Sequence, residues 1–163
     1  MAQLYRDQFA HYFNTATTTG ETTSPAWKLE GIGVDSLTMA FNPQVDQYKT
    51  IIDRNASATF KNYQIQSAVS GKRLYSEDDI YTYLNTARKQ ATAIETQLLE
   101  IDMAESVSTG TYEAIKYDIL IVINEFLGED ATISYDLYVK GTPVQGTATI
   151  TGGTPTFAPS VSL

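Results

Sequence analysis

Most of this chain alternates polar and apolar residues with a period of two, and that feature constrains its fold more than any other. In residues 133–139, for example, Ile133, Tyr135 and Leu137 alternate with more polar positions. Successive side chains of a β-strand point to opposite faces of a sheet, so such runs predict strands with one buried face. Comparable runs predict further strands in residues 26–33, 36–42, 45–53, 57–70, 94–104, 112–126 and 144–151.

One segment, residues 76–91, breaks this pattern and predicts a helix. Ser76 is the candidate N-cap, acids occupy positions 77–79, and Arg88-Lys89 lie near the end. Acids near the start of a helix and bases near its end complement the helix dipole. An apolar stripe completes the signal, at Ile80, Leu84, Ala87 and Ala91. The predicted fold is mainly β, an antiparallel β-sandwich or barrel with one flanking α-helix.

We predict that the two ends of the chain are arms that lie outside a single domain at 26–151. Residues 1–25 contain a polar tract at 15–24, preceded by aromatic residues at helical spacing, which are Tyr5, Phe9, Tyr12 and Phe13. Two interpretations stay open for this segment: a short amphipathic helix that packs on its own domain, or an arm that docks on a neighbouring subunit. Residues 152–163 are predicted to be a C-terminal arm, because two glycines and two prolines disfavour regular structure there.

Composition excludes several classes of function. The net charge of −8 and the pI near 4.5 argue against a protein that grips nucleic acid or an anionic membrane. The chain has no cysteine, and therefore no disulfide, thiolate nucleophile or Cys-ligated zinc. The N-terminus lacks the pattern of a signal peptide, and the longest aliphatic run, 119–123, is too short to span a bilayer. We expect a soluble protein that is made and used without secretion.

No combination of residues predicts catalysis, a metal site or a cofactor. His11 has no identifiable Ser–Asp partner, so we interpret it as a surface or packing residue. Acids at 77–79 and 129–130 fit a helix start and a turn, respectively. Glu100 and Asp102 share one strand face and are interpreted as solvated positions instead of a glycosidase pair. We do not expect the glycosylation sequon at Asn55 to be modified in a chain that is not secreted.

Residues 41–60 predict a long β-hairpin. A strand leads into a polar corner at Arg54-Asn55, and a second strand follows. On a monomer such a hairpin would be an exposed projection, and exposed strand edges pair with other chains. The 11 tyrosines also suit faces that are partly wet and partly packed, as at interfaces. We therefore expect an assembly.

Two stretches carry a resemblance to a known family. In residues 29–84, a strand that ends in Asn42-Pro43 leads into a hairpin with Ile51-Ile52-Asp53, then a second alternating strand and a capped acidic helix. In residues 131–159, a late strand is followed by Gly-Thr-Pro-Val-Gln-Gly-Thr and then Thr-Pro-Thr-Phe. Their order over residues 27–157 resembles the major tail tube proteins of long-tailed bacteriophages, especially those that infect Gram-positive hosts.

The resemblance implies a β-sandwich related in fold to the tube protein of type VI secretion. Six such subunits would join their inner sheets into a barrel across a hexameric ring, and rings would stack into the hollow tube of a virion tail, assembled in the cytoplasm of the host bacterium. The tube would hold a tape measure protein and would conduct DNA. Tail terminator and distal tail proteins would bind at its two ends. No membrane partner is implied.

The resemblance also implies that the hairpin and the terminal arms bridge stacked rings. The predicted contact residues of the hairpin are Gln44, Val45, Asp46, Tyr48, Lys49, Asp53, Arg54 and Asn55. A polar strand face would line the lumen, and the candidates are Asn62, Gln64, Gln66, Glu95, Gln97, Lys116 and Asp118. An acidic lumen would repel DNA phosphates and let a duplex pass. A register error of one residue would invert this assignment.

Two alternatives remain open. The first is the inner tube of a contractile tail or injection device, which differs in whether a sheath protein surrounds it. The second, from another class, is a monomeric β-sandwich that binds a surface or a carbohydrate. This second alternative predicts a ligand cleft with exposed aromatic residues and a monodisperse monomer.

Overall fold

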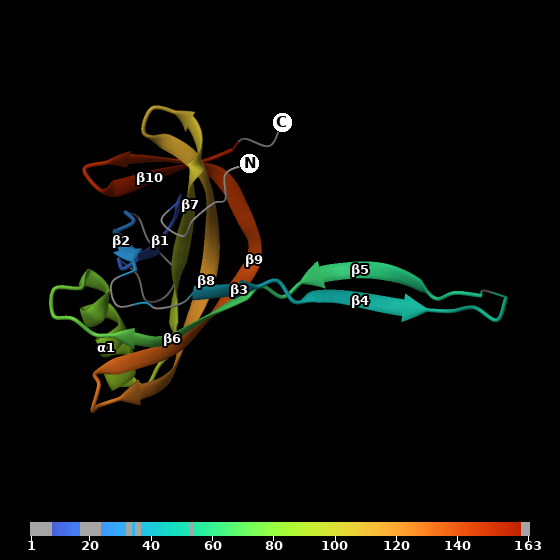
Figure 1. Ribbon diagram of the computed structural model, residues 1–163, viewed down its shortest axis with the longest axis horizontal. Helices are drawn as coiled ribbons and strands as arrows, with labels where there is room; N and C mark the ends of the chain where they lie inside the picture. The colour runs from blue at the N-terminus through green and yellow to red at the C-terminus, as the bar shows by residue number, and fades with distance from the viewer. Residues whose placement is uncertain (1–7, 17–23, 32–33, 35–36, 53, 161–163) are drawn as a thin grey trace.

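The computed structural model describes residues 8–16, 24–31, 34, 37–52 and 54–160. In this part of the chain, strands make up most of the secondary structure and a single α-helix accompanies them. Figure 1 shows a curled sheet with α1 at one end and a long two-stranded hairpin that projects to one side. The prediction of a mainly β, antiparallel fold with one flanking helix is confirmed.

The strands form one large sheet and one small one. The large sheet has the order β2-β1-β7-β8-β9-β6-β3, with β10 paired to β9, and the small sheet is β4-β5. All recorded pairs are antiparallel, and the described part of the chain does not close into a barrel. The elements are β1 Phe9–Asn14, β2 Trp27–Glu30, β3 Leu37–Ala40, β4 Pro43–Tyr48, β5 Ser57–Tyr63, β6 Gln66–Arg73, α1 Asp79–Gln90, β7 Ile94–Ser108, β8 Thr111–Leu127, β9 Thr132–Thr151 and β10 Thr154–Pro159.

Two hydrophobic cores lie on opposite faces of the large sheet. The first lies beneath α1, where Ile80 and Leu84 belong to the same buried cluster as Leu98 and Tyr117. The second lies on the other face and is made by the following buried residues: Tyr12, Trp27, Leu99, Ile101, Ala114 and Ala148. Neighbouring residues of a strand point to opposite faces, so β7 serves both cores. A sheet buried on both faces explains why the alternation in residues 94–104 is weaker than in 133–139.

A buried ionic cluster ties the curled sheet to the helix. The Nζ atom of Lys72 on β6 lies 3.2 Å from Glu30 Oε2 on β2 and 2.8 Å from Asp78 Oδ2 at the start of α1. The Tyr135 hydroxyl on β9 donates a hydrogen bond to Glu30. Burial raises the pKa of Glu30, although the Lys72 ammonium opposes that shift. The Asp78 carboxyl, which shares the same ammonium, raises the pKa of Glu30 further.

The N-terminal segment differs from the helical interpretation. Phe9–Asn14 is a strand, β1, and lies between β2 and β7 in the large sheet. Tyr12 and Phe13 are buried on opposite faces, Tyr12 in the second core and Phe13 in the first. The helical spacing was therefore misleading, because apolar residues on both faces of a buried strand also recur at three and four positions. Residues 1–7 and 17–23 of the predicted arm, including Tyr5, lie outside the described residues.

Half of the predicted C-terminal arm, 152–163, is also a strand. Thr154–Pro159 forms β10 and pairs with β9. Gly152 and Gly153, with φ values of +58° and +81°, form the turn of a tight hairpin, which favours glycine. The prolines are tolerated because β10 is paired on one side only, where a missing N–H need not break a ladder. The glycines and prolines thus mark a hairpin and an edge strand, and the prediction of irregular structure in 154–159 was wrong.

Three smaller boundaries also differ. The N-cap of α1 is Asp78 and not Ser76, because the Asp78 carboxylate accepts a hydrogen bond of 3.0 Å from the Ile80 amide. The predicted strand at 57–70 is divided into β5 and β6 at the base of the hairpin. The runs at 133–139 and 144–151 form one strand, β9, because β8 pairs along both of them with a register shift between Lys116 and Asp118.

Candidate assembly surfaces

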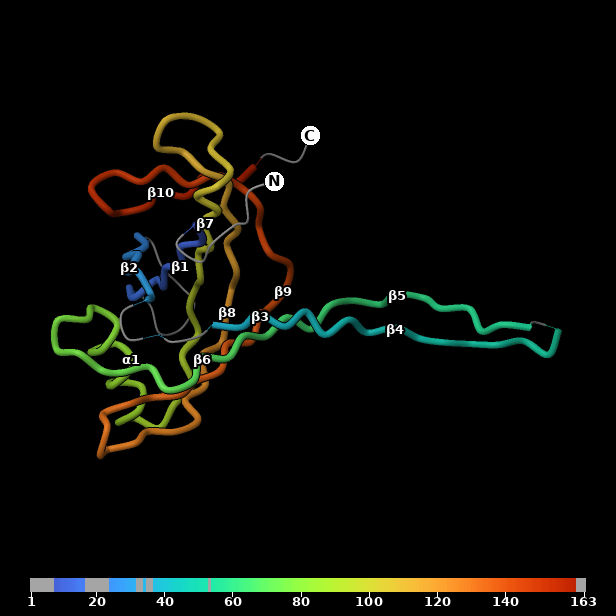
Figure 2. The backbone as a smooth tube through the Cα atoms, viewed as in Figure 1, coloured from blue at the N-terminus to red at the C-terminus, as the bar shows by residue number. Residues whose placement is uncertain are grey.

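The predicted hairpin is confirmed and projects far from the body. Figure 2 shows β4 and β5 running together away from the sheet to a distant tip. Val45 lies opposite Phe60, and Tyr48 lies opposite Ser57. All seven residues of β5 are exposed, and a Lys61–Asp46 ion pair of 2.6 Å links the strands on one face. No third described strand pairs with this ribbon, and β4 and β5 form a sheet of their own.

The hairpin exposes large apolar side chains on both of its faces. Val45 and Phe60 share one face, and Tyr48 lies on the other. At the tip, Ile51 is 103% exposed and Ile52 is 87% exposed. An isolated two-stranded hairpin is marginally stable at best in water, and contiguous apolar surface of this kind marks an interaction site. The hairpin therefore has the properties of a segment that is covered by a partner.

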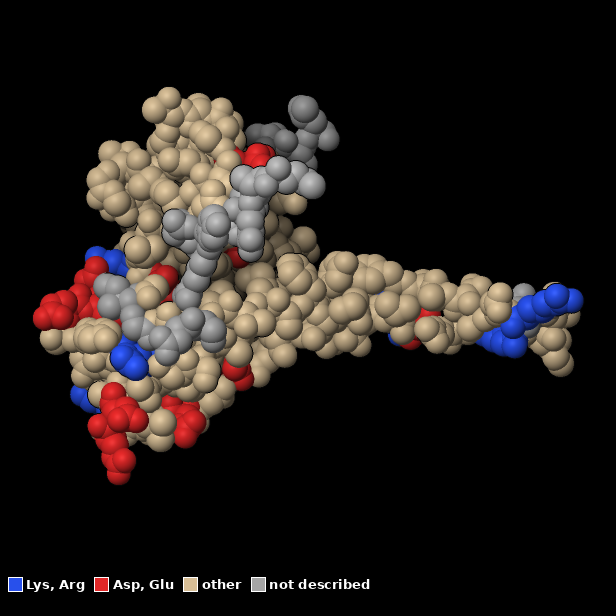
Figure 3. Space-filling model, in the orientation of Figure 1, with Lys and Arg blue, Asp and Glu red and all other residues tan. Residues whose placement is uncertain are grey.

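The predicted hairpin contacts fall into two groups. Gln44, Val45, Asp46 and Tyr48 are in β4, the first partly buried and the others exposed. Lys49, Arg54 and Asn55 lie at or next to the tip and are exposed, and Figure 3 shows that basic side chains gather there. Asp53 lies outside the described residues. That these residues contact a stacked ring stays a prediction.

Strand register brings five of the seven lumen candidates onto one face, which we call the polar face. Gln97 pairs with Asp118 across β7 and β8, and the Gln97 amide donates a 3.3 Å hydrogen bond to Asp118 Oδ1. Glu95, Leu120, Tyr138 and Gln66 occupy one continuous row across β7, β8, β9 and β6. Lys116 is on the same face at the border of the second core, where its Nζ lies 5.4 Å from the centre of the Phe157 ring. Whether this face lines a lumen stays a prediction.

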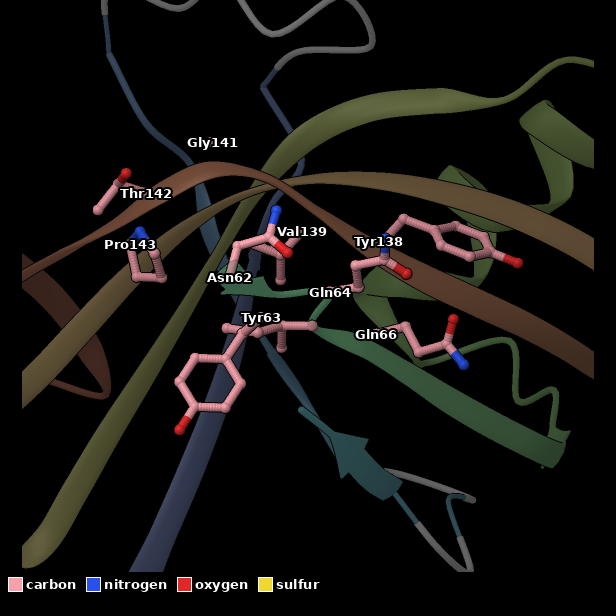
Figure 4. A pocket seen from close by; sticks show the side chains of 10 residues that line it. Asn62, Tyr63, Gln64, Gln66, Tyr138, Val139, Gly141, Thr142 and Pro143 are labelled. Atoms are coloured by element: carbon pink, nitrogen blue, oxygen red, sulfur yellow. The ribbon is translucent and has the colours of Figure 1, made fainter. Parts of the chain in front are cut away.

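The other two lumen candidates lie at the base of the hairpin, in a cleft that Gln66 of the polar face also lines. Asn62 is in β5, and Gln64 is in the connection between β5 and β6. Both line a cleft of about 670 Å³ at the base of the hairpin, which Figure 4 shows between that connection and the middle of β9, at Tyr138 and Pro143. The lining of this cleft carries amides and tyrosines and no carboxylate, histidine or lysine.

Three residues of β9 belong to the polar face but were not among the candidates. The Lys140 ammonium lies 3.1 Å from Glu95 Oε2, and Lys140 pairs with Asp118 in register. Asp136 and Tyr138 lie on the same face. The alternation of β9 could have indicated that these residues share a face, but only the pairing of β8 with β9 places them beside Glu95 and Asp118.

The isolated histidine and the acidic pairs have structural roles here. His11 Nε2 lies 3.0 Å from Glu100 Oε2 between β1 and β7, which agrees with a packing histidine. Glu129 and Asp130 lie in the β8–β9 turn, as predicted. Within the described ranges, no group of three or more His, Cys, Asp or Glu residues is placed to hold a metal. The same ranges contain no helix long and apolar enough to cross a membrane.

Comparison with known proteins identifies the fold but no family. No known family matches the chain, and no curated protein matches it. Among solved structures, the chain is similar to one chain of the "Cryo-EM structure of the anti-feeding prophage (AFP) baseplate, 6-fold symmetrised". The TM-score is 0.51 at 8% sequence identity, over 89% of this chain and 96% of that chain. The shared feature is thus the fold, over nearly the whole length of both chains.

Proposed function

We propose that this chain is a structural, ring-forming subunit of a phage-tail-like particle. Six copies join the open edges of their large sheets around a central channel, and rings stack along the channel axis. The single observation that carries the proposal is the β4–β5 hairpin, which leaves the body, exposes apolar side chains on both faces and has no partner strand in the described part of the chain.

The sheet edges support the ring. β2 and β3 are the outermost strands of the main path, and each is paired on one side only. An open edge presents unpaired backbone N–H and C=O groups, which another copy can satisfy. When the edges join into a closed barrel, the unpaired backbone groups of every copy find a partner. The six-fold symmetry named for the solved structure supports six copies as the number.

The setting that we favour is the inner tube of a tail-like injection device, including the part that enters its baseplate. The solved structure of similar fold is a prophage baseplate, which supports this setting. The tail tube of a long-tailed phage is the second candidate, favoured by the order of the hairpin, helix and late strand in the sequence. In the first setting a sheath protein surrounds the tube, so co-purification of a sheath would discriminate the two.

The polar face is our candidate for the channel lining. It offers amide and charged side chains at Gln66, Glu95, Gln97 and Asp118. In this proposal the channel holds a tape measure protein before delivery and then passes DNA or protein. Terminator and distal proteins close the two ends of the tube.

Negative-stain electron microscopy and sedimentation velocity of the concentrated chain test the proposal. We expect rings or hollow rods from the full chain. A variant in which residues 46–59 are replaced by an Asn-Gly turn should keep the body fold, judged by circular dichroism, and form no rods. If the full chain and the shortened chain are equally monodisperse at all concentrations, the proposal is wrong.

A further inference from the structure

The cleft at the base of the hairpin, which we call the hairpin-base cleft, is lined by uncharged residues. Its volume is about 670 Å³, and its walls come from the end of β5, the β5–β6 connection, the start of β6 and the middle of β9. Acidic and basic residues make up 18% of the chain, yet none of them lines this cleft. A charged ligand would lose water here without gaining an ion-pair partner, so the lining favours a neutral ligand.

Hydrogen-bonding side chains of one kind, amides, converge on the hairpin-base cleft. Asn62, Gln64 and Gln66 are exposed, and their side-chain amides make no hydrogen bond within the described part of the chain. Figure 4 shows Asn62 and Gln64 in the middle of the cleft, and Gln66 beside Tyr138. The exposed Thr142 hydroxyl is also part of the lining. Amides and hydroxyls each donate and accept, which suits a ligand that carries several hydroxyl groups.

Two exposed tyrosine rings complete the lining. Tyr63 is 55% exposed and Tyr138 is 41% exposed, and they come from different strands. The Tyr63 ring is supported from behind, since its centre lies 5.8 Å from that of Phe41 and 4.8 Å from that of Phe60. An exposed aromatic ring offers a flat apolar surface with a polar hydroxyl at its edge. A sugar ring has the matching chemistry, because its C–H groups form an apolar face and hydroxyls surround that face.

The backbone that carries these side chains is fixed in place. The Gln64 amide donates a 3.3 Å hydrogen bond to the Asn42 carbonyl, and Asn42 Nδ2 donates a 3.1 Å bond to the Gln64 carbonyl. On the other side, the Val139 amide donates a 3.0 Å hydrogen bond to the Ile65 carbonyl. The lining is therefore formed in the free chain, which lowers the cost of ordering it around a ligand.

Two other classes of ligand fit this lining less well. Residues 141–143 are skipped by the pairing of β9 with β6, β8 and β10, Gly141 has a φ of +68°, and Pro143 has no N–H. A bulged edge with a proline resists the addition of a peptide strand. The aliphatic side chains Ile65 and Val139 are half-buried, so they offer little surface to an apolar ligand.

We propose that the hairpin-base cleft binds a short neutral oligosaccharide. Tyr63 and Tyr138 stack on the C–H faces of the sugars, and the amides of Asn62, Gln64 and Gln66 bind their hydroxyl groups. This binding activity goes beyond the proposed structural function. All the lining residues belong to one copy of the chain, so the site does not depend on ring formation.

Saturation-transfer NMR of the full chain tests the proposal. The neutral probes are cellotetraose, maltotetraose and N-acetylchitotetraose, at about 5 mM, which detects dissociation constants on the order of 1 mM. We expect saturation transfer to at least one of them. Tetragalacturonate, which is charged, and a blocked tetra-alanine peptide are the ligand controls and should receive none. If no neutral saccharide receives saturation, or if only the charged probe or the peptide does, the proposal is wrong.

Substitutions locate the binding in the cleft. Tyr63→Ala and Tyr138→Ala should each weaken binding about ten-fold, because each removes a stacking ring. Gln64→Ala should weaken it about five-fold through a lost hydrogen bond. Tyr75→Ala is the matched control, since Tyr75 is 43% exposed but lies on the β6–α1 connection. Binding that Tyr75→Ala weakens as much as the cleft variants would overturn the proposed site. The proposed function has its own test in ring and rod formation, so it would stand.

Discussion

Leu98 and Leu99, adjacent residues of β7, are buried in two different hydrophobic cores on opposite faces of the large sheet, at 1% and 0% exposure. The pair shows that β7 is covered on both faces, by α1 and its cluster on one side and by Tyr12 and Trp27 on the other. A strand covered on both faces anchors the two halves of the curled sheet to each other.

Truncation of either leucine should therefore be costly. We expect Leu98→Ala and Leu99→Ala each to lower the free energy of unfolding by about 2–5 kcal/mol, because each leaves a cavity in a packed core. Urea denaturation followed by circular dichroism measures both. Met103→Ala, on the same strand but 39% exposed, is the control and should cost far less. A small cost at Leu98 or Leu99 would mean that one of the two cores is loosely packed.

Removal of the buried Lys72 ammonium should lower the free energy of unfolding at least as much as truncation of either leucine. Lys72→Met leaves the carboxyls of Glu30 and Asp78 buried without their cation, and we expect a loss of about 3–5 kcal/mol in the free energy of unfolding. Lys61→Met is the matched control, since its ion pair with Asp46 is largely exposed and should contribute about 0–1 kcal/mol. Equal effects from the two variants would contradict the structural role of the cluster.

The same cluster predicts how stability depends on pH. The pKa of Glu30 is raised in the folded chain, chiefly by burial, above its ordinary value of 4.5. The folded state therefore binds this proton more tightly than the unfolded state, and the resulting stability is fully present below pH 4.5 and is lost as pH rises through the folded pKa. Glu30→Gln should flatten that part of the profile, measured by urea denaturation at a series of pH values. If Glu30→Gln leaves the slope of stability against pH unchanged, other groups cause this pH dependence.

Close packing of β10 on β9 predicts a steric effect at Gly146. A Cβ atom there would lie 2.2 Å from the Ala158 carbonyl oxygen and 2.7 Å from the Phe157 ring. Gly146→Ala should therefore lower the free energy of unfolding by about 1–3 kcal/mol through overpacking, as judged by thermal unfolding. Gly31→Ala, where the added atom meets nothing within 4 Å, is the control. Tolerance of Gly146→Ala would show that β10 detaches easily.

Charge on the polar face predicts an effect on cargo. If this face lines the channel, Gln66→Lys with Gln97→Lys should slow DNA release from assembled particles, because lysines hold passing phosphates, and added salt should reduce the delay. Gln90→Lys is the control, since Gln90 is exposed on α1, which covers the opposite face of the sheet. Release kinetics measured with a DNA-binding dye decide the matter, and equal kinetics for all variants would remove the polar face as the lining.

Much of the fold follows from local patterns. The stripe of Ile80, Leu84 and Ala87 predicted the helix, and the hairpin at 41–60 was visible from two strands around a polar corner. The patterns failed at β1 and β10, where burial on both faces and a turn of two glycines produced signals typical of helix and linker. The sequence predicted part of the polar face, because five of its residues could be chosen by their polarity. Lys140 could not be placed beside Glu95 without the register of the paired strands.

The sequence alone determined the kind of element at most positions, because the period of the side chains and the preferences of caps and turns are local properties. Tertiary structure decided which strands are neighbours, which face of each is buried and where the two cores lie. Those outcomes depend on strand pairing between residues far apart in the chain, and a shift of one residue in any pair would exchange the buried and exposed faces. The ion cluster of Glu30, Lys72 and Asp78 arises in the same way, since only the curl of the sheet brings these residues together.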